Sequence, residues 1–163
     1  MKKWLFVIVL AALLVGCRHE EKFSTTPHIE FVSIEKVDNG TNVDDQANLV
    51  FSFQDGDGDI GLDNADTAGV FHVDSAYYYN LFVDYYEKQN GVWTLMNLPA
   101  TLNARIPHLS DNVPESIEGK LTILTYINNY SSPYDTVKLS FYLVDRALHK
   151  SNVVETPEII IHK

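Results

Sequence analysis

An all-β fold, an antiparallel sandwich of about seven strands, is what the sequence predicts, and three observations support this prediction. Apolar residues recur at every second position in the clearest segments, as a half-buried strand requires. Other β-rich runs are bounded by Gly, Pro, Asn or Asp clusters. No long segment keeps the spacing of an amphipathic helix. With 45% hydrophobic and 21% charged residues, a chain of 163 residues can bury a single core.

The alternation is clearest in residues 47–54 and 136–145, which therefore anchor the strand assignment. Between two further runs, Gln89-Asn90-Gly91 predicts a tight hairpin, because Asn-Gly readily takes the positive φ angles that such a turn needs. The complete set of expected strands is 29–37, 47–54, 77–87, 92–98, 117–127, 136–145 and 152–161.

These strands fit, in order, strands A to G of an immunoglobulin-like Greek-key sandwich. A fibronectin-like or jelly-roll variant would keep the strands and move the loops. In the immunoglobulin-like order, the loop after the second strand and the loop between the last two strands lie at one end. Residues 55–76 and 145–152 are therefore expected to be neighbours, with 99–116 as a long connection.

Charge and cysteine content exclude several classes of protein. The chain has 12 Lys+Arg against 22 Asp+Glu, a formal net charge of -10, so we expect no nucleic-acid partner. A single cysteine excludes an internal disulfide framework and a Cys-rich zinc site.

The N-terminal residues predict export. Lys2 and Lys3 precede an apolar run from Trp4 to Val15, which at 12 residues suits a signal core and falls short of the roughly 20 needed to span a bilayer. The run ends in Leu-Val-Gly-Cys17, which resembles the lipobox of bacterial lipoproteins. The resemblance implies a signal peptide over 1–16, a lipidated Cys17, a tether over 17–27 and a domain over 28–163. The alternative is a secreted protein with Cys17 as an unmodified thiol.

Residues after Cys17 bear on the destination of the chain. Arg18 stands where some lipoproteins carry an inner-membrane retention aspartate, so the resemblance implies an outer-membrane protein. Glu20 and Glu21 resemble the surface-export signal of Bacteroidota lipoproteins, although not in its usual form. Periplasmic and surface display both stay open.

An Asp/Gly-rich loop follows the second expected strand. Residues 55–66 read Asp-Gly-Asp-Gly-Asp-Ile-Gly-Leu-Asp-Asn-Ala-Asp. Crowded carboxylates repel one another, and a hard divalent cation is the usual reason for such crowding, so we expect Ca²⁺ here. Counting as in an EF-hand calcium loop gives the ligands Asp55, Asp57, Asp59, the carbonyl of Gly61, Asp63 and Asp66.

The loop also departs from that pattern. Ile60 stands at the position of the invariant turn glycine, Asp66 replaces a bidentate Glu, and the flanks are strand-like, so this is not an EF-hand. The alternative is a solvated Asp/Gly turn without an ion.

A second loop supplies a further candidate ligand. Residues 145–151 read Asp-Arg-Ala-Leu-His-Lys-Ser, which resembles the Asp-x-Ala-Gly-Asn-x-Ser ending of many bacterial immunoglobulin-like modules. Together with Phe-Gln-Asp-Gly-Asp-Gly-Asp-Ile-Gly at 53–61, it resembles small outer-membrane lipoproteins of the Bacteroidota, a family that implies no particular activity. Asp145 lies an even number of residues after the inward-facing residues of its strand, so its side chain is expected to point to the same side. We expect it either to ligate the ion or to cap its own turn.

Aromatic and hydroxyl side chains add two weaker signals. On the expected strand 77–87, Tyr78, Phe82 and Tyr86 share one face, which is either an exposed row that binds a glycan or a protein, or a covered surface. Three Asp-Ser/Thr-aliphatic triplets resemble the O-glycosylation sites of Bacteroidota exported proteins; their hydroxyl residues are Thr67, Ser75 and Thr136.

Catalytic signatures are missing from the sequence. It contains no HExxH, no GxSxG elbow, no cysteine nucleophile in the mature chain beyond the lipidation site, and no Gly-rich phosphate loop between strand and helix. Paired carboxylates of a glycoside hydrolase are set by space rather than by sequence distance, so Glu87, Glu115 and Glu118 stay as nominal candidates. We therefore expect a lipid-anchored binding or structural module without catalysis. An accessory glycan-binding lipoprotein is the alternative, and a hydrolase is a third class.

Overall fold

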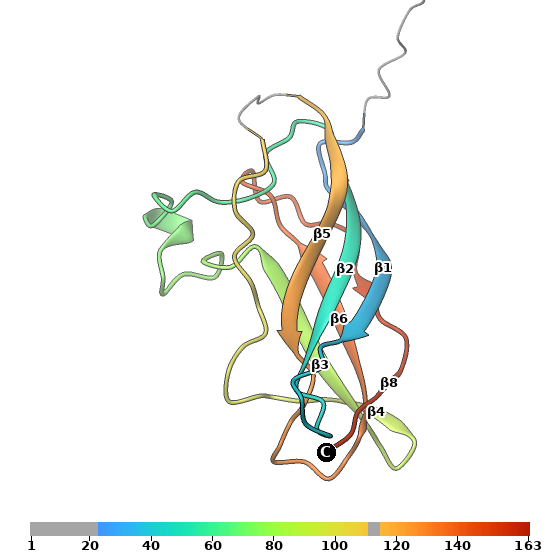
Figure 1. Ribbon diagram of the computed structural model, residues 1–163. Coiled ribbons are helices and arrows are strands. Elements are labelled where there is room, and N and C mark those ends of the chain that lie inside the picture. The colour runs from blue at the N-terminus through green and yellow to red at the C-terminus, as the bar shows by residue number, and fades with distance from the viewer. Residues whose placement is uncertain (1–22, 111–114) are drawn as a thin grey trace, which may run out of the picture.

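The computed structural model describes residues 23–110 and 115–163 and confirms an antiparallel all-β fold (Figure 1). The predicted signal peptide, Cys17 and the first part of the predicted tether lie outside the described residues. Eight strands and one short 3-10 turn, η1 (Gly69–Phe71), make up the described fold. The strands are β1 (His28–Lys36), β2 (Gln46–Asp55), β3 (Leu81–Gln89), β4 (Val92–Leu95), β5 (Ile117–Tyr126), β6 (Thr136–Leu143), β7 (Val154–Glu155) and β8 (Ile159–Ile160).

The strands form two sheets. One has the order β1-β2-β5; the other has the order β4-β3-β6-β7, with β8 also paired to β6. In the A-to-G lettering the fourth strand would lie beside the fifth. The structure instead pairs β4 with β3, because Asn90 (φ 52) and Gly91 (φ 84) make the tight hairpin that the sequence predicts. The connection from β4 to β5 therefore crosses between the sheets, as in a fibronectin-like variant.

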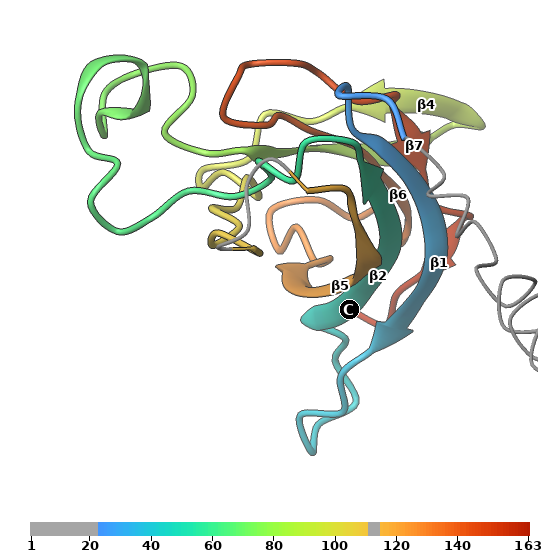
Figure 2. The same ribbon diagram turned by 90° about the horizontal axis from the view of Figure 1, so that it is seen from above.

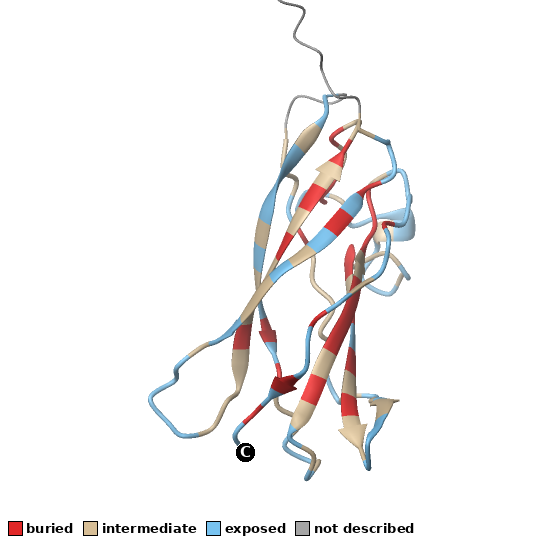
Figure 3. Cartoon of the chain, turned by 90° about the vertical axis from the view of Figure 1, so that its right-hand side faces the viewer, coloured by how far each residue is buried: buried red, intermediate tan, exposed pale blue. Residues whose placement is uncertain are grey.

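Alternating burial along the strands builds the core between the sheets (Figure 3). In β2 the inward residues are Ala47, Leu49, Phe51 and Phe53, all buried, and the intervening residues are partly exposed. Phe51 meets Phe141 of the other sheet with 5.4 Å between ring centroids. Burial of such a pair is the main stabilising term that joins the two sheets.

Three expected strands differ clearly from the structure in extent. The third starts at Leu81, because residues 77–80 form turns and irregular chain before it, and the fourth, expected over 92–98, ends at Leu95. The last, expected over 152–161, is split into β7 and β8 at Thr156-Pro157. There the Thr156 hydroxyl accepts the Leu139 N–H at 3.0 Å, and Pro157 has no N–H to donate to a ladder.

A long segment projects from the sandwich between β2 and β3 (Figures 1 and 2). Arg105 ties together the two ends of this segment. Its guanidinium donates to the carbonyl oxygens of Tyr78 (2.7 Å), Asp63 (2.9 Å) and Asp66 (2.7 Å). The described residues 23–110 and 115–163 hold no helix that is long and apolar enough to cross a membrane.

The loops after β2 and after β6 are neighbours at one end of the sandwich, as predicted. The N–H groups of Arg146 and Ala147 donate to the carbonyl and to the carboxylate of Asp59, at 3.3 and 3.1 Å. The described chain also begins at this end, whereas the β3–β4 hairpin and the β5–β6 loop lie at the other (Figure 1).

Leu148 takes the place that glycine has in the resembling turn, and it adopts the glycine conformation. Its φ is 69°, and its N–H donates to the Asp145 carbonyl at 3.2 Å. Leu148 is 37% exposed, so burial of its side chain does little to offset the free-energy cost of the positive φ angle.

We expect Leu148→Gly to raise the free energy of unfolding by about 1 kcal/mol, because glycine takes positive φ without the Cβ clash. Thermal unfolding measures the change, which corresponds to a few degrees in Tm. The matched control is Ala147→Gly in the same loop, where φ is not positive; it should lower stability by about 0.5 kcal/mol. Destabilisation by both substitutions alike would contradict the assignment of strain to Leu148.

Candidate metal site

Three carboxylates converge where β2 ends. Asp55 is the last residue of β2 and faces inward, so its side chain is fully buried. Asp57 and Asp59 follow in the loop, and one oxygen from each of the three carboxylates lies within 4.8 Å of the others. A group of this kind could hold a metal ion.

Each of these carboxylates leaves one buried oxygen without a donor. One oxygen of Asp55 accepts the Asp59 N–H at 3.0 Å, and one of Asp59 accepts the Ala147 N–H at 3.1 Å. The Oδ1 atoms of Asp55, Asp57 and Asp59 are buried and have no hydrogen-bond partner. An unpaired buried polar atom costs free energy, and three such atoms in one place form a group that could hold a cation.

Burial and mutual repulsion raise the pKa values of two carboxylates in the cluster. Burial, followed by the charges of Asp57, Asp59 and Asp145, raises the pKa of Asp55 from 3.8 to about 7. Burial, followed by Asp145 and Asp57, raises the pKa of Asp59 to about 6. At neutral pH, ionisation of these carboxylates therefore costs free energy in the folded state, and a nearby positive charge would lower that cost.

The loop glycines are fixed by close packing as well as by backbone angle. Gly58 (φ 72) and Gly61 (φ 106) supply the left-handed turns, while Ile60 is fully buried and does not adopt positive φ. A Cβ on Gly58 would lie 2.2 Å from the Glu115 carbonyl oxygen, and one on Gly61 would lie 2.2 Å from that of Pro107. The sharp turns thus flank Ile60, which confirms that the loop is not an EF-hand.

Asp63 and Asp66, which EF-hand counting also gives as ligands, lie outside the three-carboxylate cluster. The Arg146 guanidinium binds both oxygens of Asp66, at 2.7 and 3.1 Å, and one oxygen of Asp63 at 3.3 Å. Asp66 also accepts the Asp63 N–H at 2.7 Å. A single arginine from the β6–β7 loop thus pairs with both carboxylates and offsets part of their charge. The carbonyl of Gly61 stays a predicted ligand.

Asp145 is buried beside the cluster and caps its own turn. Its two oxygens meet the N–H of His149 at 2.7 Å and the imidazole Nδ1 at 2.9 Å. Burial raises the pKa of Asp145, and this carboxylate in turn raises the pKa of His149. Of the two roles expected for Asp145, the structure shows the turn cap, and its charge adds to the crowding.

The aromatic row expected on the third strand is half-buried and packs against neighbouring side chains. Phe82 stacks on Tyr142 with centroids 5.0 Å apart and a 10° interplanar angle, and the ammonium of Lys138 lies 5.4 Å from the Tyr86 ring centroid. Tyr78 leaves the row and packs against Arg105, because β3 starts only at Leu81. The row as a binding face stays a prediction.

The candidate glycosylation residues differ in exposure. Thr67 is exposed on the projecting segment. The hydroxyl of Ser75 donates to the Gly69 carbonyl at 2.9 Å, and that of Thr136 donates to Asp135 at 3.0 Å. Thr67 is thus the exposed residue among the three, and attachment of a glycan remains a prediction.

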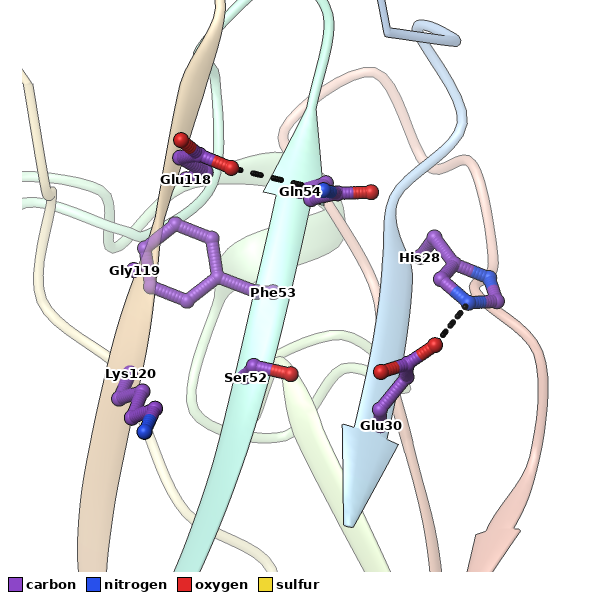
Figure 4. Close-up of a pocket in the computed structure, with 8 residues that line it drawn as sticks. All are labelled: His28, Glu30, Ser52, Phe53, Gln54, Glu118, Gly119 and Lys120. Atoms are coloured by element: carbon purple, nitrogen blue, oxygen red, sulfur yellow. Dashed lines mark hydrogen bonds and ion pairs between the residues drawn. The ribbon is translucent and has the colours of Figure 1, made fainter. Parts of the chain in front are cut away.

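The carboxylates considered for glycoside cleavage do not meet. Glu87 is fully buried and accepts from Asn129 (2.8 Å), Ser132 (2.6 Å) and Gln89 (3.1 Å), so it pins the β5–β6 loop. Glu115 lies next to the glycine loop. Glu118 lines a polar groove of about 440 Å³ on the outer face of the smaller sheet, with Glu30 and His28 at its far side (Figure 4).

Comparisons with known proteins bring no relative. No protein-family model, no curated protein and no solved structure matches the chain. The assignment of the site therefore depends on its geometry.

Without an added ion, we expect the cluster to make the protein lose stability as the pH rises from about 4 to about 7. Over this interval the raised pKa values of Asp55 (about 7) and Asp59 (about 6) let the folded chain bind more protons than the unfolded chain, so the free energy of unfolding falls. Thermal unfolding in a chelator at about pH 5 and about pH 7.5 measures this effect.

Asp55→Asn should flatten the dependence by removing the titrating group. The matched control is Asp74→Asn, since the Asp74 side chain is 88% exposed and distant from the cluster in sequence. Identical pH profiles for the wild type and Asp55→Asn would contradict the raised pKa of Asp55.

Proposed function

We propose that the protein is a lipid-anchored module of the outer membrane that binds a partner or supports a structure, and that Ca²⁺ stabilises one end of its sandwich. The observation that carries the calcium assignment is the set of three buried, unpartnered oxygens from Asp55, Asp57 and Asp59. The partner, a protein or a glycan, is not specified by these residues.

The chemistry of the donors favours calcium among the common ions. All three groups are carboxylates, which are hard oxygen ligands, and no His or Cys side chain belongs to the group. Calcium accepts several carboxylates in flexible geometry, and carbonyl oxygens and water complete its shell. Magnesium keeps more of its water and prefers fewer carboxylates, so an enclosed cluster suits it less.

Anchoring is supported by the sequence around Cys17. The short apolar run and the Leu-Val-Gly-Cys end match a lipoprotein signal, and acyl chains on the cysteine would hold the domain at the membrane. No catalysis is part of this proposal, because Glu87 is enclosed by its own hydrogen-bond partners.

Calcium should raise the melting temperature, and chelation should lower it by several degrees. An ion that binds only the folded state stabilises it by about 2.7 kcal/mol when its free concentration is a hundred times Kd. Asp57→Asn should shrink the shift, because it removes one of the unpartnered oxygens. The matched control is Asp63→Asn, whose oxygen pairs with Arg146 and should not contribute to the ion.

Scanning calorimetry with calcium, magnesium and chelator separates this site from simple screening. A solvated turn would respond equally to both ions or to neither. Either of those results, or an equal loss of the shift in Asp57→Asn and Asp63→Asn, would contradict the proposed site.

Labelled fatty acid should be incorporated into the protein in cells, and Cys17→Ala should abolish both the label and retention in the membrane fraction. Cys17 is the single cysteine of the chain, so no other thiol can substitute for it. Soluble, unlabelled wild-type protein would refute the anchor without affecting the calcium site.

A further inference from the structure

We infer that the ion-bound loop is the docking site for residues 23–27, so that calcium sets how far the domain can extend from its anchor. This inference rests on the proposed calcium site and anchor and extends them to a regulated connection. Residues 23–27 were expected to be part of a free tether, yet the structure shows them bonded to the acidic end of the sandwich.

The first half of the docking site is the glycine loop. The Gly56 N–H donates to the Ser24 carbonyl at 2.8 Å. A Cβ on Gly56 would lie 2.2 Å from the Phe23 carbonyl oxygen and 2.8 Å from the Ser24 carbonyl carbon. The segment therefore lies directly on the backbone between two of the cluster carboxylates, Asp55 and Asp57, where only glycine leaves room for it.

The second half is the β6–β7 loop. The imidazole of His149, which also holds Asp145, hydrogen-bonds the main chain of Thr25. The Asn152 side chain accepts the Ile29 N–H at 2.9 Å and donates to the Ile29 carbonyl at 2.8 Å. Residues 23–29 thus bridge both loops that surround the carboxylate cluster.

Dependence on the ion follows from this position. Gly56 can hold Ser24 only while the chain from Asp55 to Asp59 keeps its tight curl. In the absence of a cation the like charges in that curl repel one another, which favours looser arrangements of the loop. Within the docked segment Phe23 is half-buried and Pro27 is buried, whereas Ser24, Thr25 and Thr26 are exposed. The middle of the segment is therefore held mainly by its hydrogen bonds to the two loops, and it is the part that a looser acidic loop would release.

The reach of the anchor changes accordingly. Five residues, 18–22, separate Cys17 from Phe23, so the docked state keeps Phe23 within about 20 Å of the lipidated residue. Release of residues 23–27 adds about 17 Å to that limit. The β3–β4 hairpin and the β5–β6 loop lie at the end of the sandwich opposite to the docked segment (Figure 1).

Hydrogen exchange of the full-length lipoprotein in detergent tests the inference, with calcium or with chelator. The amide of Gly56 reports docking, because its partner is the Ser24 carbonyl, whereas the amide of Ile29, which Asn152 holds at the start of β1, reports whether the adjoining strand stays in place. The Gly56 amide should exchange about tenfold faster in chelator, whereas the amides of Ile29 and of Phe141 in β6 should change much less. Equal exchange of the Gly56 amide in the two conditions would overturn the inference.

Gly56→Ala supplies an independent route to the undocked state, because its Cβ collides with Phe23 and Ser24. It should show rapid proteolysis within residues 23–27 even in calcium, while the Ile29 amide stays protected. The matched control is Gly40→Ala at the opposite end, where a Cβ meets nothing within 4 Å and only the positive φ is strained; it should keep the calcium-dependent protection. If Gly56→Ala does not fold, the wild-type comparison alone decides.

Calcium binding measured by titration calorimetry separates the two proposals. Binding without a change in exchange at Gly56 would overturn the docking inference and leave the calcium site standing. No binding, with unchanged exchange, would overturn both. Uniform acceleration of all amides in chelator would also overturn the docking inference, because it would indicate global unfolding in place of local release.

Discussion

Three carboxylates, Asp55, Asp57 and Asp59, are crowded together at one end of the sandwich, and the arrangement of both loops at that end depends on them. The period-two alternation that places Phe51 and Phe53 in the core places Asp55 in the interior as well. A buried charge is costly unless it is paired, and Asp57 and Asp59 bring two more to the same place. Protein donors satisfy only one oxygen of Asp55 and one of Asp59, and the remaining oxygens are the ones to which the proposed cation would bind.

Pairing by arginine sorts the acidic residues of the loop into two groups. Arg146 pairs with Asp63 and Asp66, and Arg105 holds the carbonyls of the same stretch. Within residues 23–110 and 115–163, no arginine is bonded to the three clustered carboxylates, and Asp145, held by His149, adds negative charge to them. One half of the loop is thus paired by protein cations, and the other half is the part to which the proposed ion would bind.

The sequence was sufficient to predict the strands, the hairpin at Asn90-Gly91 and the adjacency of the two end loops, because periodicity and turn chemistry are local signals. It was also sufficient to predict the first half of the acidic loop. It could not divide Asp63 and Asp66 from the cluster, since their partner Arg146 lies about 80 positions away. The sequence could not predict the burial of Glu87 either, because its partners Asn129 and Ser132 come from another loop. The break between β7 and β8 could have been predicted from Pro157, since proline has no N–H to donate to a strand ladder.

The two ends of the sandwich are consequently stabilised by different means. At the far end the buried Glu87 accepts hydrogen bonds from Asn129, Ser132 and Gln89, so the β5–β6 loop is held by protein donors. At the near end the Asp55 cluster has three buried oxygens without a donor, and Ser24 lies on the same loop through its bond to Gly56. A calcium ion bound as proposed would therefore act on the segment that leads toward Cys17. It would not act on the loops at the opposite end, whose buried carboxylate already has its partners.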